Sequence, residues 1–138
     1  MDKENIFRYW GKARPTNPDG PAYHPLPYHC LDVAAVGEVY LKRHPRLLDF
    51  LAKKTGAPLE LVLEWVRLLL FLHDLGKFSQ GFQGQNPGLL KALQGIENSK
   101  ASYSIRHDTL GYMAWEKWLQ PELEEHPFLQ PPKGIGHR

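Results

Sequence analysis

The stretch that decides the fold class is LELVLEWVRLLLFLHDLGK, residues 59–77. Between residues 58 and 74, apolar side chains cover most of the circumference of the helix that their spacing predicts. A helix that is apolar all round is typical of the centre of a domain. It ends in His73-Asp74, and Gly76 follows where the chain must stop or bend. We therefore expect an all-α fold built around this helix.

The segments on either side of the central helix also predict helices. Apolar residues at three- and four-residue spacing predict a helix over 29–43, which His44-Pro45 ends before a short helix over 46–54. No segment shows the alternation of a strong strand. After the central helix we expect a loop or short turns over 78–88, a short helix over 87–94, a polar loop over 95–105 and a last helix over 107–119.

Proline divides the chain into three regions. Residues 1–28 combine prolines with aromatic side chains, which predicts an irregular arm whose rings pack on the domain. Residues 29–120 form the predicted helical core. Residues 121–138 are rich in proline and predict an extended tail.

Composition indicates one globular domain. The 138 residues are 42% hydrophobic and 23% charged, and the net charge of +2 is too small to argue for nucleic-acid binding by itself. The single cysteine, Cys30, excludes an internal disulfide and fits a reducing compartment. The first residues lack the apolar core of a secretory signal, and no stretch is long enough to cross a membrane. We therefore expect a cytoplasmic protein without a membrane partner.

Histidines at helix ends are the candidate metal ligands. His73 and Asp74 end an apolar helix, where burial costs free energy unless the two groups are paired or bind a metal; a helix cap is the alternative. His29 and His107 begin helices, and each alone is more typical of a surface residue. Together they can converge on one cavity with a ligand set that suits Mn, Fe, Co, Ni or Zn. An aspartate that bridges two such ions would suit phosphodiester hydrolysis.

Two further side chains can be interpreted either as part of the chemistry or as ordinary surface or core residues. Lys77 follows His73 by four residues and can place a cation beside a phosphate oxygen, although a solvated lysine is the simpler reading. Cys30 can act as a nucleophile, but packing is favoured because no base stands in an obvious position beside it.

Four stretches together resemble one known family. They are FRYWGK (7–12), YHCLDVAAV (28–36), LLLFLHDLGKFSQGFQ (68–83) and RHDTLGYMAW (106–115). In order and spacing they are similar to the amino-terminal half of the HD nuclease domain of the CRISPR-associated helicase-nuclease of type I systems. The resemblance implies an HD-type helical bundle and a metal-dependent hydrolase that cuts single-stranded DNA in antiviral defence.

The resemblance also implies roles for individual residues. One ion would be held by His29, His73, Asp74 and a late aspartate. Asp74 would bridge to a second ion held by His107 and an adjacent His-His pair, and Lys77 would assist at the phosphate. The implied cofactors are two divalent ions, Mn, Fe, Co or Ni, with Mg as a further candidate.

The end of the sequence departs from the family pattern. His137 falls where the first histidine of the pair is expected, but Arg138 stands in place of the second, and the late aspartate is absent. We therefore expect a shortened bundle with weakened activity, whose exposed helix faces favour a homodimer or a domain swap.

The implied partners are single-stranded DNA, a helicase domain on the same or a partner chain, and an RNA-guided surveillance complex. Two alternatives stay open. One is a non-catalytic HD remnant that acts as a binding or regulatory module. The other is an HD phosphohydrolase acting on nucleotides, against which the YHCLDVA and FRYWGK stretches argue.

Overall fold

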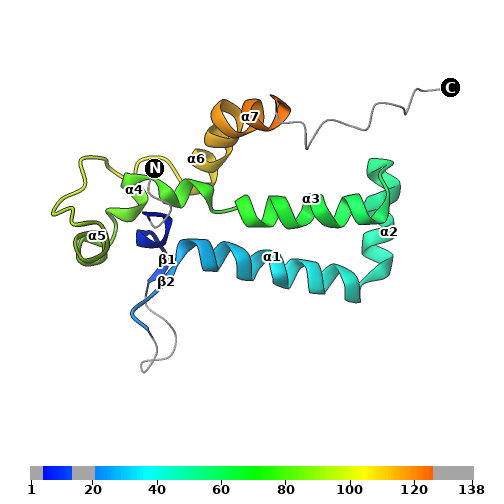
Figure 1. Cartoon of the computed structure of the whole chain (residues 1–138), viewed down its shortest axis with the longest axis horizontal. Helices are drawn as coiled ribbons and strands as arrows, with labels where there is room; N and C mark the ends of the chain where they lie inside the picture. The colour runs from blue at the N-terminus through cyan, green and yellow to red at the C-terminus, as the bar shows by residue number, and fades with distance from the viewer. Residues whose placement is uncertain (1–4, 14–20, 126–138) are drawn as a thin grey trace.

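Two antiparallel helices form the long axis of the protein in the computed structural model, which describes residues 5–13 and 21–125. Helix α1 (Leu26–Arg43) lies beside α3 (Leu59–Leu72), and α2 (Pro45–Thr55) crosses their far ends (Figure 1). The all-α prediction is confirmed, as is the order of these three helices. Because α1 and α3 run in opposite directions, the start of α1 lies beside the end of α3.

A short hairpin precedes α1. After the 3-10 turn η1 (Asn5–Arg8), strand β1 (Trp10–Ala13) pairs antiparallel with β2 (Tyr23–Pro25), with an irregularity between Trp10 and Lys12. The expectation of an irregular arm without strands is therefore wrong for these residues. Proline excludes a strand only where a ladder needs its N–H, and Pro25 is the last residue of β2.

Helix α1 begins three residues earlier than the predicted 29–43. Pro27 lies in its first turn, where an N–H has no helical partner, so this proline is compatible with the helix. The early start places His29 in the first turns of α1 and not at its first residue. Leu26 N–H also donates to Tyr9 O at 2.7 Å, which ties the beginning of α1 to the hairpin.

Short helices follow α3. The elements are η2 (Leu75–Phe78), α4 (Gln80–Gln83), α5 (Pro87–Gln94), α6 (His107–Ala114), the π-helical turn η3 (Trp115–Leu119) and α7 (Gln120–Glu125). The predicted helices 87–94 and 107–119 are confirmed. The expectation of an extended chain from Pro121 is wrong for residues 121–125, which form α7. Pro121 has no N–H to donate, but it lies where α7 follows the π-helical turn. The N–H of the preceding residue, Gln120, bonds to Trp115 O there.

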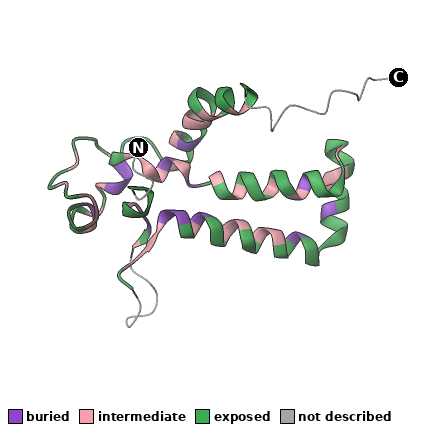
Figure 2. Cartoon of the chain, viewed as in Figure 1, coloured by how far each residue is buried: buried purple, intermediate pink, exposed green. Residues whose placement is uncertain are grey.

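Most of the buried residues gather at the end of the molecule where α1 begins, and a smaller group, Leu41, Leu48 and Val62, lies at the far end around α2. Figure 2 shows buried positions where α1 begins and around α4, and this core includes Trp10, Leu26, Cys30, Phe82 and Leu90. Helix α3 has a single buried residue, Val62, so its predicted central position is wrong within the described part of the chain. Its contacts there are mainly with α1 and α2, which leave its other faces uncovered.

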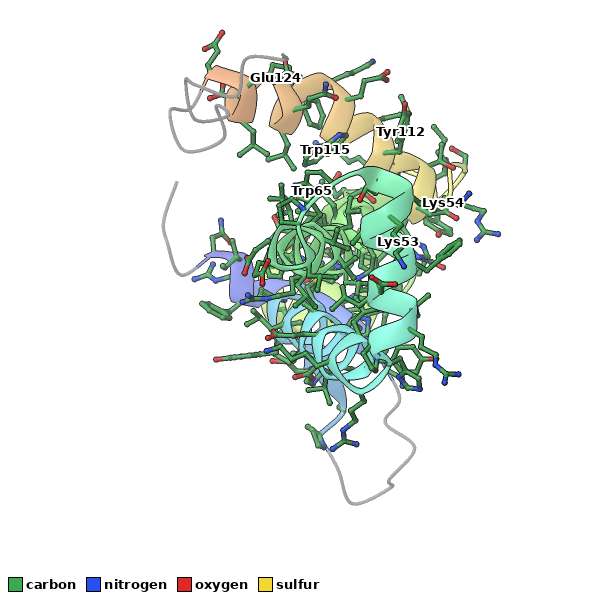
Figure 3. The ribbon with its side chains drawn as sticks, turned by 90° about the vertical axis from the view of Figure 1, so that its right-hand side faces the viewer. Lys53, Lys54, Trp65, Tyr112, Trp115 and Glu124 are labelled. Carbon is green, nitrogen blue, oxygen red and sulfur yellow. The ribbon has the colours of Figure 1, made fainter. Side chains whose placement is uncertain are left out.

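The outer face of α3 is apolar. In the end-on view of Figure 3, Trp65 lies on the side of α3 nearest the α6–η3 segment, which carries Tyr112 and Trp115. Leu68 and Trp115 line a hollow of about 340 Å³ between α3 and this segment.

Over residues 5–13 and 21–125, no helix combines the length and the apolar character needed to cross a membrane.

Candidate metal centre

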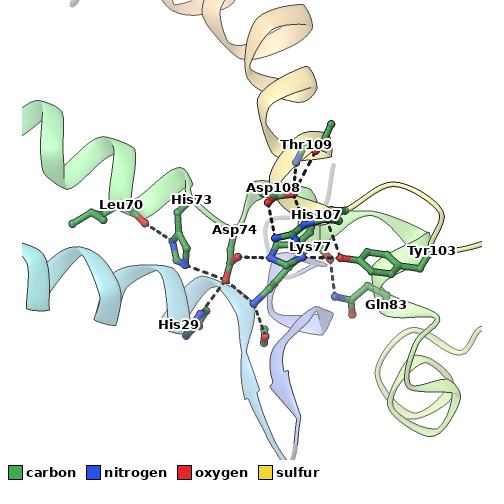
Figure 4. A network of polar contacts seen from close by, with 12 residues as sticks. His29, Leu70, His73, Asp74, Lys77, Gln83, Tyr103, His107, Asp108 and Thr109 are labelled. Carbon is green, nitrogen blue, oxygen red and sulfur yellow. Dashed lines mark hydrogen bonds and ion pairs between the residues drawn. The ribbon is translucent and has the colours of Figure 1, made fainter.

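The antiparallel pairing of α1 and α3 places three sequence-predicted residues together. His29 comes from the start of α1, and His73 and Asp74 follow the end of α3 directly (Figure 4). The Asp74 side chain is only 5% exposed. A carboxylate buried to this extent costs free energy unless donors or cations surround it.

Four side chains surround the Asp74 carboxylate. Its Oδ2 lies 2.7 Å from Lys77 Nζ, 3.0 Å from His29 Nε2 and 3.1 Å from His73 Nε2. Its Oδ1 lies 3.4 Å from His107 Nε2. The two oxygens of one carboxylate thus face different residues, and such an aspartate can bridge two cations.

The hydrogen bonding of His73 defines which nitrogen is free. Its Nδ1 lies 2.5 Å from Leu70 O, and because a carbonyl oxygen only accepts, Nδ1 must carry the proton and donate it. In the neutral ring the Nε2 lone pair then points at Asp74 Oδ2 across 3.1 Å. Two electron-rich atoms attract at this distance only when a cation lies between them, either a proton or a metal ion.

The donor atoms also fit a metal ion in their spacing. Two ligand atoms bonded to one ion at about 2.1 Å and at right angles lie about 3.0 Å apart. Asp74 Oδ2 lies 3.0 Å from His29 Nε2 and 3.1 Å from His73 Nε2, and the ligand atoms of all three residues lie within 4.8 Å of one another. His29, His73 and Asp74 can therefore hold a metal ion, and two imidazoles with one carboxylate suit a first-row transition metal.

The protonation of His29 favours the same role. Burial lowers the pKa of His29 below its ordinary 6.5, and the Lys77 cation lowers it further, although Asp74 acts in the opposite direction. A lowered pKa keeps the imidazole neutral near pH 7. The neutral ring is the form that binds a metal ion.

His107 is oriented by a residue that the sequence analysis did not single out. The Tyr103 hydroxyl lies 2.8 Å from His107 Nδ1 and accepts the His107 backbone N–H at 3.1 Å. Phe82 packs edge-on against both rings. With Nδ1 held by Tyr103, the Nε2 atom of His107 is directed toward Asp74. A partner on the far nitrogen of a histidine is how proteins commonly fix a metal ligand.

Gln83 connects this site to the hairpin. Its side chain is fully buried, donating to Lys77 O at 2.8 Å and to Trp10 O at 2.9 Å, and accepting from Trp10 N–H at 3.2 Å. One amide therefore holds both the β1 strand and the backbone that carries Lys77.

Cys30 adjoins the centre, and its surroundings disfavour a reactive thiolate. Burial, followed by the negative charge of Asp74, raises the pKa of its thiol to about 11. The thiol is therefore protonated at neutral pH and packs as a small apolar side chain.

Five of the sequence-predicted site residues lie together, because His29, His73, Lys77 and His107 all surround the carboxylate of Asp74. His107 meets Asp74 but is not in the group of three whose ligand atoms converge. His137 lies outside the described residues. Tyr103 was missed, although its position four residues before His107 is a signal that could have suggested the contact. Gln83 was missed because it falls in a stretch expected to form turns.

Comparisons with known proteins point to one family. The family model described as "Cas3, HD domain" matches residues 10–133. The CRISPR-associated endonuclease/helicase Cas3 of Escherichia coli is 36% identical over 78 residues, which cover 56% of this chain and 9% of that protein. The protein of the same name from Thermus thermophilus is 39% identical over 82 residues, covering 59% of this chain and 8% of that protein. The matched part thus spans less than a tenth of either relative. No solved structure matches the chain significantly.

Proposed function

This chain belongs to the Cas3 HD-domain family, and from that premise we propose that it is a metal-dependent nuclease domain that hydrolyses phosphodiester bonds in single-stranded DNA. The observation that carries the proposal is the convergence of the ligand atoms of His29 and His73 with the buried carboxylate of Asp74. These residues supply two imidazoles and a carboxylate at the spacing of metal ligands.

Each residue has a proposed task. Asp74 and the two histidines would hold a divalent ion, and such an ion would supply Lewis-acid chemistry toward a phosphoryl oxygen and a water molecule. The Leu70 carbonyl keeps the His73 proton on Nδ1, so that Nε2 remains a ligand. Lys77, whose ammonium reaches the same carboxylate, places a positive charge where the phosphate would carry negative charge.

We further propose a second ion on the other side of Asp74. Support comes from His107, whose Nε2 faces Asp74 Oδ1. Mn, Fe, Co and Ni suit imidazole and carboxylate ligands, and Mg is a further candidate. His137 remains a proposed additional ligand.

The relatives' names suggest the partner. Both are endonuclease/helicases, so we propose that a helicase on the same or another chain supplies the single strand. The proposed setting is antiviral defence directed by an RNA-guided surveillance complex.

The test is a cleavage assay. Metal-stripped protein is incubated with circular single-stranded DNA and Mn, Ni, Co or Mg in turn, beside His73→Ala, Asp74→Ala and the control His44→Ala. His44 stacks on Tyr40 at the junction of α1 and α2, and its ring bonds to the Tyr40 carbonyl. We expect metal-dependent cutting that only the first two variants lose. Absence of cutting with every ion by folded protein would overturn the nuclease proposal and favour a binding module.

A further inference from the structure

Lys77 lies inside the ligand cluster and not at its edge. Its Nζ is 2.7 Å from Asp74 Oδ2, the same oxygen that faces His29 and His73. Its side chain is 13% exposed, so solvent screens this ion pair only weakly. Any divalent ion that uses Asp74 Oδ2 must therefore compete with a fixed ammonium group for the same atom.

The ammonium group has a second set of partners that do not involve Asp74. Nζ donates to Gly11 O at 3.1 Å and lies 5.3 Å from the centre of the Phe82 ring. The carbonyl comes from β1 and the ring from α4, so both are held by elements other than the one that carries Lys77. An ammonium that left the carboxylate would keep one hydrogen bond and one cation–π contact.

The Gly11 carbonyl is in reach because β1 passes very close to α1. A Cβ built on Gly11 would meet Leu26 Cα at 3.0 Å and His29 Cβ at 3.1 Å. A larger residue at this position would push the strand away from the centre, and the carbonyl would move with it. The close approach of β1 to α1 thus places an acceptor for the Lys77 ammonium beside the metal ligands.

We propose that Lys77 is an internal competitor for the metal centre: its ammonium neutralises Asp74 until a divalent ion binds, and the ion then displaces it onto the Gly11 carbonyl and the Phe82 ring. This inference rests on the proposed function, because it requires an ion at Asp74. Two cations on one oxygen repel each other, so the ion pair lowers the affinity of the centre for metal. It also keeps the buried carboxylate compensated whenever no ion is bound.

The proposal predicts that removing the charge of Lys77 strengthens metal binding and does not weaken it. Removing the positive charge in Lys77→Met should raise the affinity for Mn²⁺ by about tenfold or more, because a competing cation is lost. Lys77→Gln tests the same point with a neutral side chain that can still donate to Gly11 O. Lys53→Met is the matched control, since Lys53 is exposed and pairs with Asp49 at 2.6 Å on α2.

Affinity is measured without DNA, by titrating Mn²⁺ into metal-stripped full chain and following the spectrum of the free ion by electron paramagnetic resonance. Circular dichroism checks the fold of each variant, and Lys77→Gln decides the result if Lys77→Met does not fold. Tighter binding by the neutral variants, with Lys53→Met unchanged, is the expected result. Equal or weaker binding by a folded neutral variant, while the wild type binds, overturns the inference alone. No binding by the wild type or any variant overturns the metal site and this inference together.

Discussion

Replacing Gln83 by methionine should destabilise the fold far more than an ordinary polar-to-apolar change. Methionine has nearly the same length and volume, so the main loss is hydrogen bonding. Without the amide, Trp10 N–H, Trp10 O and Lys77 O lose a partner at a site where Gln83 is fully buried. An unpaired buried polar group costs roughly 1–3 kcal/mol. Three such groups, partly offset by local relaxation, should lower the free energy of unfolding by about 3–5 kcal/mol.

Such a loss would be a large part of the total, since domains of this kind unfold with only about 5–15 kcal/mol. Urea denaturation followed by tryptophan fluorescence measures it. Gln80→Met is the control, because Gln80 lies on the same short helix but is exposed, and it should change stability by less than about 0.5 kcal/mol. A Gln83→Met protein within about 1 kcal/mol of the wild type would refute the reasoning, because orphaned groups cannot cost so little unless water reaches them.

Four further predictions concern the surroundings of the site. Tyr103→Phe removes the hydroxyl that holds His107, and Mn²⁺ affinity should fall about 10-fold to 100-fold in a calorimetric titration, the usual effect of losing such a partner. Gly76→Ala should unfold at clearly lower urea than Gly88→Ala. A Cβ on Gly76 would lie 1.9 Å from His107 O, whereas a Cβ on Gly88 would meet Asn86 Oδ1 at an ordinary contact distance of 3.6 Å; equal midpoints would contradict this packing. Cys30, with its pKa raised to about 11, should react negligibly with a thiol reagent at pH 8 in the folded protein. Because that pKa is raised, its contribution to stability is present below the unfolded thiol's pKa of about 9 and is lost as pH rises toward 11, which urea midpoints across this range would show.

The helices were predictable from local pattern, but their burial was not. Apolar spacing predicted α3 because a helix imposes its own periodicity. The same pattern could not say which elements cover the helix, and in the described residues only Val62 is buried on it. The β1–β2 hairpin was missed for a related reason. Its pairing depends on contacts with α1 and Gln83, which no local pattern in residues 10–25 records.

The ligands were predictable because they stand at helix ends. Such positions meet when helices pack side by side, and His29 and His73 do so on antiparallel partners. The supporting contacts were less visible. Lys77 was expected near a phosphate, yet its bond to Gly11 O depends on how closely β1 approaches α1. Tyr103 acts through its hydroxyl, and its position four residues before His107 is the one sign of this contact in the sequence.

The central claim is that Asp74 and two histidines form a metal centre, and anomalous diffraction from Mn²⁺-soaked crystals tests it most directly. The account predicts a peak of anomalous density between His29 Nε2, His73 Nε2 and Asp74 Oδ2, absent from Asp74→Asn crystals grown and soaked alike. Mn²⁺ bound elsewhere on the protein with no peak at this point, or an unchanged peak in Asp74→Asn, would contradict it.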